Sequence, residues 1–234
     1  MPKLTKIQVR PDFVDEVYKS LLDAISDGSL APGARITQEE IAEQLHVSRS
    51  PVLQALRLLK KDGLVQDAPG RGIVIAPLDA DWIGNLYQVR GALDVLAARL
   101  AAERKHDIGR EVIDAGRKAA RGKNVKAMID ADIAFHTSIY RASGNPLIFD
   151  TTQLHWVHLR RVMGAVLQSA AQRESIWDEH AAIAEAIAAG NAPLAARLSE
   201  NHAHVARENL ISRLGEVLDT SQRPARQPQH GRGG

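Results

Sequence analysis

Two helix starts, eleven residues apart, constrain this chain more than any other feature. Thr37 is followed three residues later by Glu40, which is the spacing of a capping box at the start of a short helix. Ser48 reads as the N-cap of a second helix, which we expect to run to Lys61. Only the segment HVS (46–48) separates the two helices, so the pattern predicts a helix-turn-helix.

The segments on either side complete a small domain. Residues 12–27 repeat apolar side chains at helical spacing and end at Gly28, and a loop with the sequence APGARI (31–36) follows. After the second helix, LVQDAPGRGIVIAP (64–77) contains two β-prone segments around a Pro-Gly turn, which predicts a hairpin. The order helix, helix, turn, helix, hairpin predicts a winged helix-turn-helix domain over residues 1–77.

From Asp79 the sequence becomes rich in alanine and loses its strand signals. Short breaks predict six helices, at about 81–105, 108–121, 123–143, 146–170, 174–189 and 192–214. Six helices with short connections predict an antiparallel all-helical bundle over residues 78–219, and so a mainly α fold. The polar ending, 220–234, is rich in Pro, Gly and Arg and is expected to be a disordered tail.

Composition excludes several classes of protein. The chain has no cysteine, which excludes disulfides and thiolate metal sites, and it has no run of about 18 apolar residues that would span a membrane. We therefore expect a cytoplasmic protein without a membrane partner. The net charge is only +2, but residues 48–72 carry five basic and two acidic side chains, whereas residues 1–47 carry five basic and eight acidic ones. A basic face beside an acidic body can orient a protein on phosphate.

The basic face supplies the candidate DNA contacts. A helix-turn-helix places the start of its second helix against base edges in the major groove, where an arginine can bind guanine through two hydrogen bonds. The candidate DNA-binding residues are Arg35, Ser48, Arg49, Ser50, Arg71 and Gly72. Arg49 is the expected base reader, and Arg71 and Gly72 lie at the tip of the hairpin. The alternative is that both arginines are solvated surface charges.

These residues carry a resemblance to a known family. PGARITQEEIAEQLHVSRSPVLQALRLLKKDGLV with its GRG wing resembles the N-terminal domain of GntR-family transcription regulators, over about residues 11–77. The helical remainder resembles the FCD effector domain of the FadR-type subgroup, and six rather than seven helices resemble its VanR-like branch. The resemblance implies the same six DNA contacts. Leu53 and Gln54 depart from the arginine and glutamate that relatives often carry, so the operator preference of the family does not transfer.

Four side chains of the second domain are candidate metal ligands. Asp132 and His136 are four residues apart and share one helical face. His180 lies about 14 Å before the break at Gly190, and His202 lies about 17 Å after it. If these two helices are antiparallel, the imidazoles reach nearly the same height, on faces that also carry Ile176, Ile183 and Ile187, and Leu194, Leu198 and Val205.

An Asp-His-His-His set suits a divalent ion, with zinc favoured and nickel or manganese possible, and it leaves coordination positions open. The alternative is that these are core histidines bonded to nearby carboxylates. The resemblance supports the metal, because a metal-binding subset of FCD domains carries an Asp-x3-His pair and two later histidines at similar spacing.

The same resemblance suggests where an effector would bind. Arg90 is the candidate that would orient a small carboxylic or sugar acid, since similar family members have an arginine in that helix. The alternative is that Arg90 forms a surface ion pair with Asp94, four residues on. Trp177 is expected to close the pocket, with simple core packing as its alternative.

Together these features predict a DNA-binding transcriptional regulator, most simply a repressor, and not an enzyme. It would bind a palindromic double-stranded DNA operator as a homodimer and respond to an acid bound at the metal. Two alternatives stay open. One is a metal-dependent enzyme with a DNA-binding appendage, although the bundle offers no obvious general acid–base partner. The other is an architectural DNA-binding protein that responds to no ligand.

Overall fold

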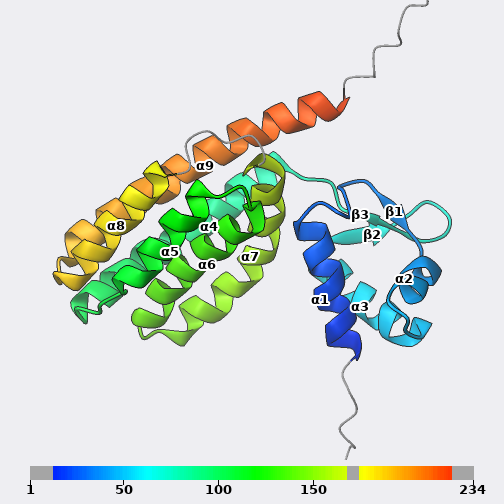
Figure 1. Ribbon diagram of the computed structural model, residues 1–234, viewed down its shortest axis with the longest axis horizontal. Helices are drawn as coiled ribbons and strands as arrows, with labels where there is room; N and C mark the ends of the chain where they lie inside the picture. The colour runs from blue at the N-terminus through cyan, green and yellow to red at the C-terminus, as the bar shows by residue number, and fades with distance from the viewer. Residues whose placement is uncertain (1–12, 168–173, 223–234) are drawn as a thin grey trace, which may run out of the picture. The chain divides into compact units, whose positions relative to one another are not determined.

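The chain divides into two compact units, Met1–Leu78 and Asp79–Gly234. The computed structural model describes residues 13–167 and 174–222 (Figure 1). Among the described helices, none has the combination of length and apolar character that is needed to cross a membrane.

The first unit has the expected order of elements. Its helices and strands are α1 (Phe13–Ser26), β1 (Arg35–Ile36), α2 (Gln38–Gln44), α3 (Arg49–Lys61), β2 (Val65–Asp67) and β3 (Ile73–Ile75). Helix α1 packs on α3, and the apolar face predicted for the first helix is buried at Val17, Leu21 and Ile25. Phe13, at the start of that face, is exposed. These elements form the winged helix-turn-helix that the sequence predicts.

The capping box at the start of α2 is confirmed. The backbone N–H of Glu40 donates to Thr37 Oγ1 at 3.3 Å, and the backbone N–H of Thr37 donates to Glu40 Oε2 at 2.7 Å. Both bonds satisfy donors that would otherwise lack a partner in the first turn. Ser48 occupies the N-cap position of α3 as predicted, but its side chain makes no capping hydrogen bond.

A three-stranded antiparallel sheet forms the wing, in the order β1-β3-β2. Strands β2 and β3 form the predicted hairpin, with Val65 opposite Ile75 and Asp67 opposite Ile73. The expectation that residues 31–36 are only a loop is wrong, because Arg35 and Ile36 pair with Val74 and Ile73 of β3. A two-residue strand has no periodicity of its own and forms because β3 offers a free edge.

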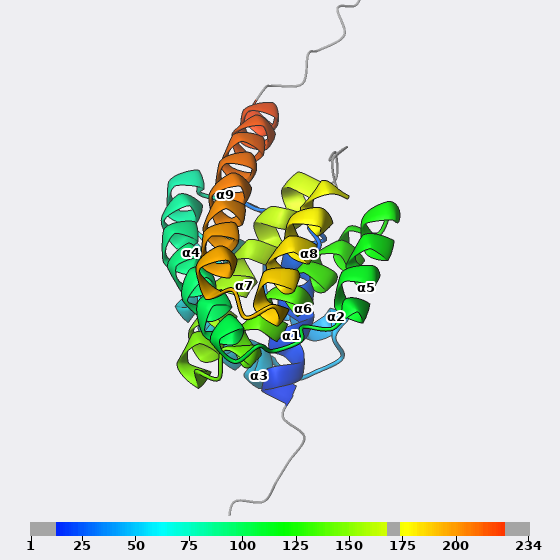
Figure 2. The same ribbon diagram turned by 90° about the vertical axis from the view of Figure 1, so that its left-hand side faces the viewer.

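The described part of the second unit contains the six predicted helices. They are α4 (Ala80–Glu103), α5 (Arg110–Arg121), α6 (Val125–Ala142), α7 (Pro146–Val166), α8 (Ser175–Ala188) and α9 (Ala192–Gln222). Helix α9 packs against α4 on one side and α8 on the other (Figure 2). Helices α6, α7 and α8 also pack on α4.

Small residues bring α4 and α9 close together. A Cβ at Gly84 would lie 3.2 Å from Ile211 Cδ1, and one at Gly91 would lie 3.4 Å from Ala203 Cβ. Arg207 Nε donates to the Gly84 carbonyl at 3.2 Å, which adds a polar contact between the same two helices. This tight pair holds Arg90 and His202, which come from the middle of α4 and α9, within one bundle interior.

The expected end of the last helix needs correction. Helix α9 continues past residue 214 to Gln222, so residues 220–222 are helical and not part of a tail. Gly215 does not stop the helix, because a single glycine costs only about 1 kcal/mol in a helix interior. The first proline after it is Pro224. The rest of the expected tail, 223–234, lies outside the described residues.

Candidate functional site

The start of α3 and the wing tip present the candidate DNA-binding side chains. Ser48, Arg49 and Ser50 are all exposed in the first turn of α3, and Arg71 is exposed in the turn between β2 and β3. Exposed polar groups at a helix start, beside a cationic loop, suit a base edge and its neighbouring phosphates. Each of the two arginines also has a protein partner, since Arg49 and Arg71 both pair with Glu39 of α2.

Arg35 and Gly72 have structural roles within the wing. The Arg35 guanidinium donates to the main-chain carbonyl of Arg71, at 3.0 Å from Nε. Gly72 has a φ of +97°, and a Cβ there would lie 2.9 Å from the Ile36 carbonyl oxygen. Any other residue would therefore be strained and would push β1 away. Arg35 therefore stabilises the wing, and the backbone that lies close to Gly72 is that of strand β1.

Leu53 lies on the surface of α3 and not in the core. Its side chain is 37% exposed, and the neighbouring Gln54 is exposed as well. The buried face of α3 is instead formed by Val52, Ala55, Leu56 and Leu59. The position at which the sequence is expected to depart from the family pattern therefore lies on the accessible side of α3.

In the second unit, His180 of α8 and His202 of α9 meet as predicted. Helices α8 and α9 are joined by a tight turn at Gly190, and the two Nε2 atoms are 3.2 Å apart. Both side chains are buried. The predicted heights along two antiparallel helices are thus confirmed, because the rise per residue fixes where each imidazole lies.

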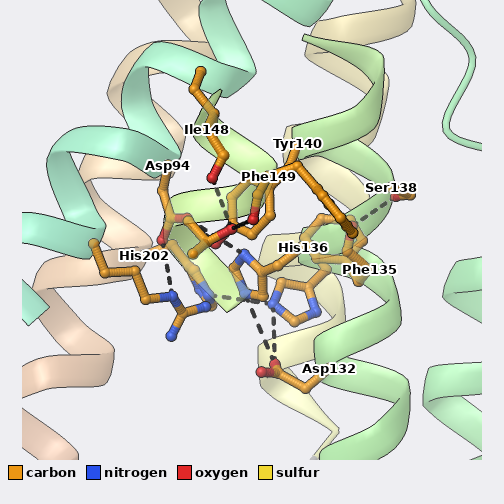
Figure 3. Close-up of polar contacts among 12 residues, drawn as sticks. Asp94, Asp132, Phe135, His136, Ser138, Tyr140, Ile148, Phe149 and His202 are labelled. Atoms are coloured by element: carbon orange, nitrogen blue, oxygen red, sulfur yellow. Dashed lines mark hydrogen bonds and ion pairs between the residues drawn. The ribbon is translucent and has the colours of Figure 1, made fainter. Parts of the chain in front are cut away.

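His136 of α6 completes a cluster of three imidazoles. One ring nitrogen from each of His136, His180 and His202 lies within 4.8 Å of the other two. Asp132, one turn before His136, has Oδ1 3.9 Å from His136 Nε2 and 3.7 Å from His180 Nε2. Figure 3 shows the Asp132 carboxylate pointing toward the imidazoles. The four side chains singled out in the sequence come together from α6, α8 and α9.

Two acidic residues that sequence reasoning missed lie behind the histidines. Glu179 Oε2 is 2.8 Å from His202 Nδ1, and Asp94 Oδ1 is 4.0 Å from His136 Nδ1. A carboxylate hydrogen-bonded to Nδ1, as Glu179 is to His202, holds the proton on that nitrogen and leaves the Nε2 lone pair free to bind a cation, whereas Asp94 lies beyond hydrogen-bond distance of His136. Glu179 directly precedes His180 in the sequence, and this adjacency was a usable signal that Glu179 lies near the cluster. No local pattern marks Asp94 as a neighbour of His136. Tyr140 donates its hydroxyl proton to Asp94 and fixes that carboxylate.

Burial keeps the imidazoles of His136 and His180 uncharged. The pKa of His136 lies well below its usual value because of burial first, and then because of the positive charge of Arg90 and the neighbouring histidines. Burial also lowers the pKa of His180, with smaller effects from His202 and Arg90. Neutral imidazoles have the lone pairs that a metal ligand requires.

The residues present fit a divalent metal. Tetrahedral zinc with Zn–N distances near 2.0–2.1 Å places its nitrogen ligands about 3.3 Å apart, close to the observed separation of His180 and His202. Among the described residues, His136 Nε2 is buried without a hydrogen-bond partner. An orphaned nitrogen beside two others is costly in a purely structural cluster, because a buried polar group needs a partner, and a cation satisfies it.

A cavity of about 260 Å³ opens beside this cluster. Its wall includes Arg90, Asp132, His136, His202 and Trp177, together with aliphatic side chains of α7 and α9. The two candidate effector-binding residues therefore line the same space as three of the four candidate metal ligands. A small volume with a polar end and an apolar end suits a small organic molecule.

Arg90 is a buried residue, so the expected alternative of a surface ion pair needs correction. Only 3% of it is exposed, and its Nε lies 3.4 Å from Asp94 Oδ2. The guanidinium carbon lies 4.3 Å from the centre of the Trp156 ring. Burial lowers the pKa of Arg90, but Asp94 and the nearby tyrosines outweigh that effect and the net pKa is raised. Arg90 thus brings a permanent positive charge to the cavity wall.

Trp177 faces into the bundle, which corrects the expected face of α8. The sequence places Ile176 on the inner face with His180, but Ile176 is 37% exposed and Trp177 is buried. The Trp177 ring lies 4.7 Å from that of His180 and fits against α5, where Gly116 leaves room for it. This space on α5, which the sequence of α8 cannot reveal, admits Trp177 in place of Ile176, while His180, Ile183 and Ile187 are buried as predicted.

Replacing Gly116 with alanine is expected to destabilise the bundle. The new Cβ would lie 2.0 Å from Trp177 Cη2, so the indole must move, and overpacking of this kind costs about 1–3 kcal/mol. Denaturant unfolding measures the loss. Gly215→Ala in α9 is the matched control, because nothing lies within 4 Å of a Cβ there and alanine favours a helix. Equal stability of the two variants would contradict this packing role of Gly116.

Comparison with known proteins agrees with both units. The model of the bacterial regulatory proteins of the gntR family matches residues 13–75, and the FCD domain model matches residues 85–205. The chain is 28% identical to an HTH-type transcriptional regulator in an unstable DNA locus of Streptomyces ambofaciens. The matched segment of 192 residues covers 80% of each chain. It is 27% identical over 205 residues to a protein named as the D-xylose utilization operon transcriptional repressor of Paenarthrobacter nicotinovorans, covering 86% of this chain and 90% of that one.

A solved structure shows the same fold. McbR/YncC of Escherichia coli superposes with a TM-score of 0.75 at 20% identity, over 88% of this chain and 99% of that one. These relatives are transcriptional regulators and not enzymes, as the sequence predicts. The chain therefore belongs to the GntR family of bacterial regulatory proteins, as a transcriptional regulator that joins a GntR DNA-binding domain to an FCD effector domain.

Proposed function

We propose that this regulator is a repressor that binds a palindromic operator as a homodimer and is controlled by a small carboxylic or sugar acid bound beside a metal ion. The observation that carries the proposal is the cluster of three histidines beside Asp132, two of which, His136 and His202, line a cavity together with Asp132 and the charged Arg90. A metal-independent regulator has no use for three buried imidazoles, of which His136 has a nitrogen left unpaired.

Asp132, His136, His180 and His202 are the residues that would hold the ion. Their nitrogen and carboxylate donors favour zinc, with nickel and manganese as the other candidates. When bound, such an ion supplies positive charge and open coordination positions that attract a carboxylate. Glu179 would keep the imidazole of His202 in the correct tautomer.

Arg90 and Trp177 would define how the acid lies in the cavity. The guanidinium of Arg90 presents donors in a fixed fork, which suits a carboxylate. Its own partner, Asp94, and the Trp156 ring hold it in place, so little side-chain entropy is lost when an acid binds. The Trp177 indole would cover the apolar part of the acid.

Control of DNA binding would follow from a difference in affinity. An acid changes operator binding only if it prefers one arrangement of the two DNA-binding domains over another. Release of the operator is the simpler outcome for a repressor, and the name of the Paenarthrobacter relative supports the repressor assignment. Because that relative is named for a D-xylose operon, sugar-derived acids belong in any search for the effector.

Two exposed apolar side chains support a homodimer. Trp82 and Val89 are 42% and 54% exposed, and they are seven residues apart on one face of α4. Large apolar groups that recur on one helix face favour burial against a partner. A two-fold dimer would double the number of base pairs that one recognition helix can read and would match a palindrome. Sedimentation of the full chain tests this, and a monomer at micromolar concentration would contradict it.

Elemental analysis and a thermal-shift screen test the central proposal. We expect about one divalent ion per chain, and we expect selected carboxylic or sugar acids to raise the Tm of the metal-loaded protein. After treatment with a chelator the same acids should have no effect, and zinc should restore it. Stabilisation by an acid that survives chelation would contradict the metal's role. A protein without metal, which no acid stabilises, would instead be the architectural DNA binder.

A further inference from the structure

The recognition helix and the wing are joined through one oxygen atom. Glu39 Oε1, at the start of α2, lies 3.1 Å from Arg49 Nη1 of α3 and 2.6 Å from Arg71 Nη2 in the wing tip. Arg49 and Arg71 are 22 residues apart in the sequence, and Glu39 belongs to neither of their elements. The Glu39 carboxylate thus forms ion pairs with both of the arginines that are best placed to contact DNA.

The carboxylate itself is held firmly. Glu39 is the second residue of α2, where free backbone N–H groups and the helix dipole favour negative charge. Its pKa is lowered, first by a backbone hydrogen bond at this helix start and then by the charges of Arg71 and Arg49. Glu39 therefore stays ionised at neutral pH. Arg71 is fixed from its other side as well, because Arg35 donates to its carbonyl oxygen.

The pairing leaves both arginines available for DNA. All three side chains are at least partly exposed, and surface ion pairs of this kind contribute little to folding stability. Arginine has five N–H donors, so Arg49 can keep its bond to Glu39 and still present two donors to a guanine edge. An arginine that contacts a phosphate instead brings the negative Glu39 carboxylate close to the DNA backbone, where its charge opposes binding.

We propose that Glu39 is a specificity-determining residue: it orients Arg49 and Arg71 for reading an operator and penalises their contacts with the phosphates of other DNA. On an operator both ion pairs persist beside the base contacts. On unrelated DNA, where affinity depends on phosphate neutralisation, the carboxylate subtracts one charge from the interface. This inference rests on DNA binding by the GntR domain and does not depend on the metal or the acid effector.

The test compares Glu39→Gln with the parent as full-length chains. The specific DNA is the duplex that the parent enriches from a randomised library, and the non-specific DNA is a scrambled duplex of the same composition. Fluorescence anisotropy between 50 and 200 mM salt gives both affinities. We expect the variant to bind the scrambled duplex roughly five- to tenfold more tightly at physiological salt. The slope of log K against log salt concentration should also become more negative by about one for each DNA-binding domain.

The affinity for the enriched duplex should change by less than about twofold, because base contacts contribute there beside phosphate contacts. The ratio of the affinity for the enriched duplex to that for the scrambled duplex should therefore fall. Glu40→Gln is the matched control, since it removes the same charge one residue away and glutamine still serves in a capping box. It should leave the ratio unchanged. In an Arg71→Gln background, Glu39→Gln should have a smaller effect, because one of its two partners is gone.

Three results would overturn the proposal. They are an unchanged ratio in Glu39→Gln, an equal fall of the ratio in Glu40→Gln, or full additivity of Glu39→Gln with Arg71→Gln. Thermal unfolding of each variant shows that the comparison involves folded protein. If the parent enriches no duplex at all, DNA recognition itself fails, and that outcome is distinct from any change in the ratio.

Discussion

Replacing His180 with alanine is expected to remove the metal and the effector response while DNA binding without effector persists. His180 is fully buried between the rings of Phe135 and Trp177, and it contacts both His202 and Asp132. Loss of a supporting contact to a metal ligand already costs about 10–100-fold in affinity, and loss of a ligand itself should cost more. Elemental analysis should find the bound ion reduced from about one per chain to background.

The same variant separates the two functional units of the protein. Gel shifts with the operator should match those of the parent in the absence of acid, because α3 and the wing belong to the other compact unit. Addition of the acid should change the shift for the parent only. His204→Ala is the control, since His204 lies on α9 two residues from His202 but is exposed and pairs with Glu208. An undiminished acid response in His180→Ala would exclude the proposed metal site.

Deleting a buried ring also leaves a cavity, which by itself costs about 2–5 kcal/mol. His202→Gln is a second variant that removes an imidazole without leaving a large cavity, because glutamine keeps a polar side chain of similar length at the cavity wall. Both variants should lose the metal, and circular dichroism should show that both retain their helices. A folded His202→Gln protein with a full complement of metal would contradict the ligand role of His202.

Replacing Arg49 with alanine is expected to cause the largest loss of operator binding. A bidentate contact from arginine to guanine contributes about 1–3 kcal/mol, so a two-fold dimer that loses one such contact in each half-site should lose about 2–6 kcal/mol. The loss should be much larger on operator DNA, since a scrambled duplex offers no matching guanine and loses only the positive charge of Arg49. Anisotropy with both duplexes at one salt concentration measures it.

Arg49→Lys distinguishes a base contact from a phosphate contact. Lysine keeps the charge but lacks the planar fork of donors, so it should restore non-specific binding and little of the specific binding. Full rescue by lysine would mean that Arg49 contacts phosphate only. Arg49 also pairs with Glu39, and the alanine variant loses that ion pair. The ion pair between Glu39 and Arg71 remains, so the wing should stay in place.

Local patterns in the sequence predicted the elements of both units. The capping box at Thr37, the break at residues 46–48 and the helical periodicity around His180 each depend on residues within about one helical turn. The pairing of His180 with His202 was also predictable, because a short turn between antiparallel helices leaves little freedom in their relative height. The change of composition at Asp79 predicted two domains, and the family resemblance then identified them as GntR and FCD domains, as the comparisons support.

Contacts between distant elements were not predictable in this way. The pairing of β1 with β3 and the inward rotation of Trp177 each depend on a space or an edge that another element supplies. Asp94 behind His136 and Glu39 between two arginines are ordinary acidic residues in the linear sequence.

The sequence by itself thus determined which helices form, where they begin and which side chains could carry the chemistry. Caps, breaks and periodicity act within a few residues and leave a readable record. Only the tertiary structure decided the partners of those side chains: that Arg90 is buried on Asp94, that His136 and His202 share one cavity with it, and that one carboxylate links the recognition helix to the wing. Such pairings depend on how whole elements pack, and packing depends on the combined shape of many side chains far apart in the chain.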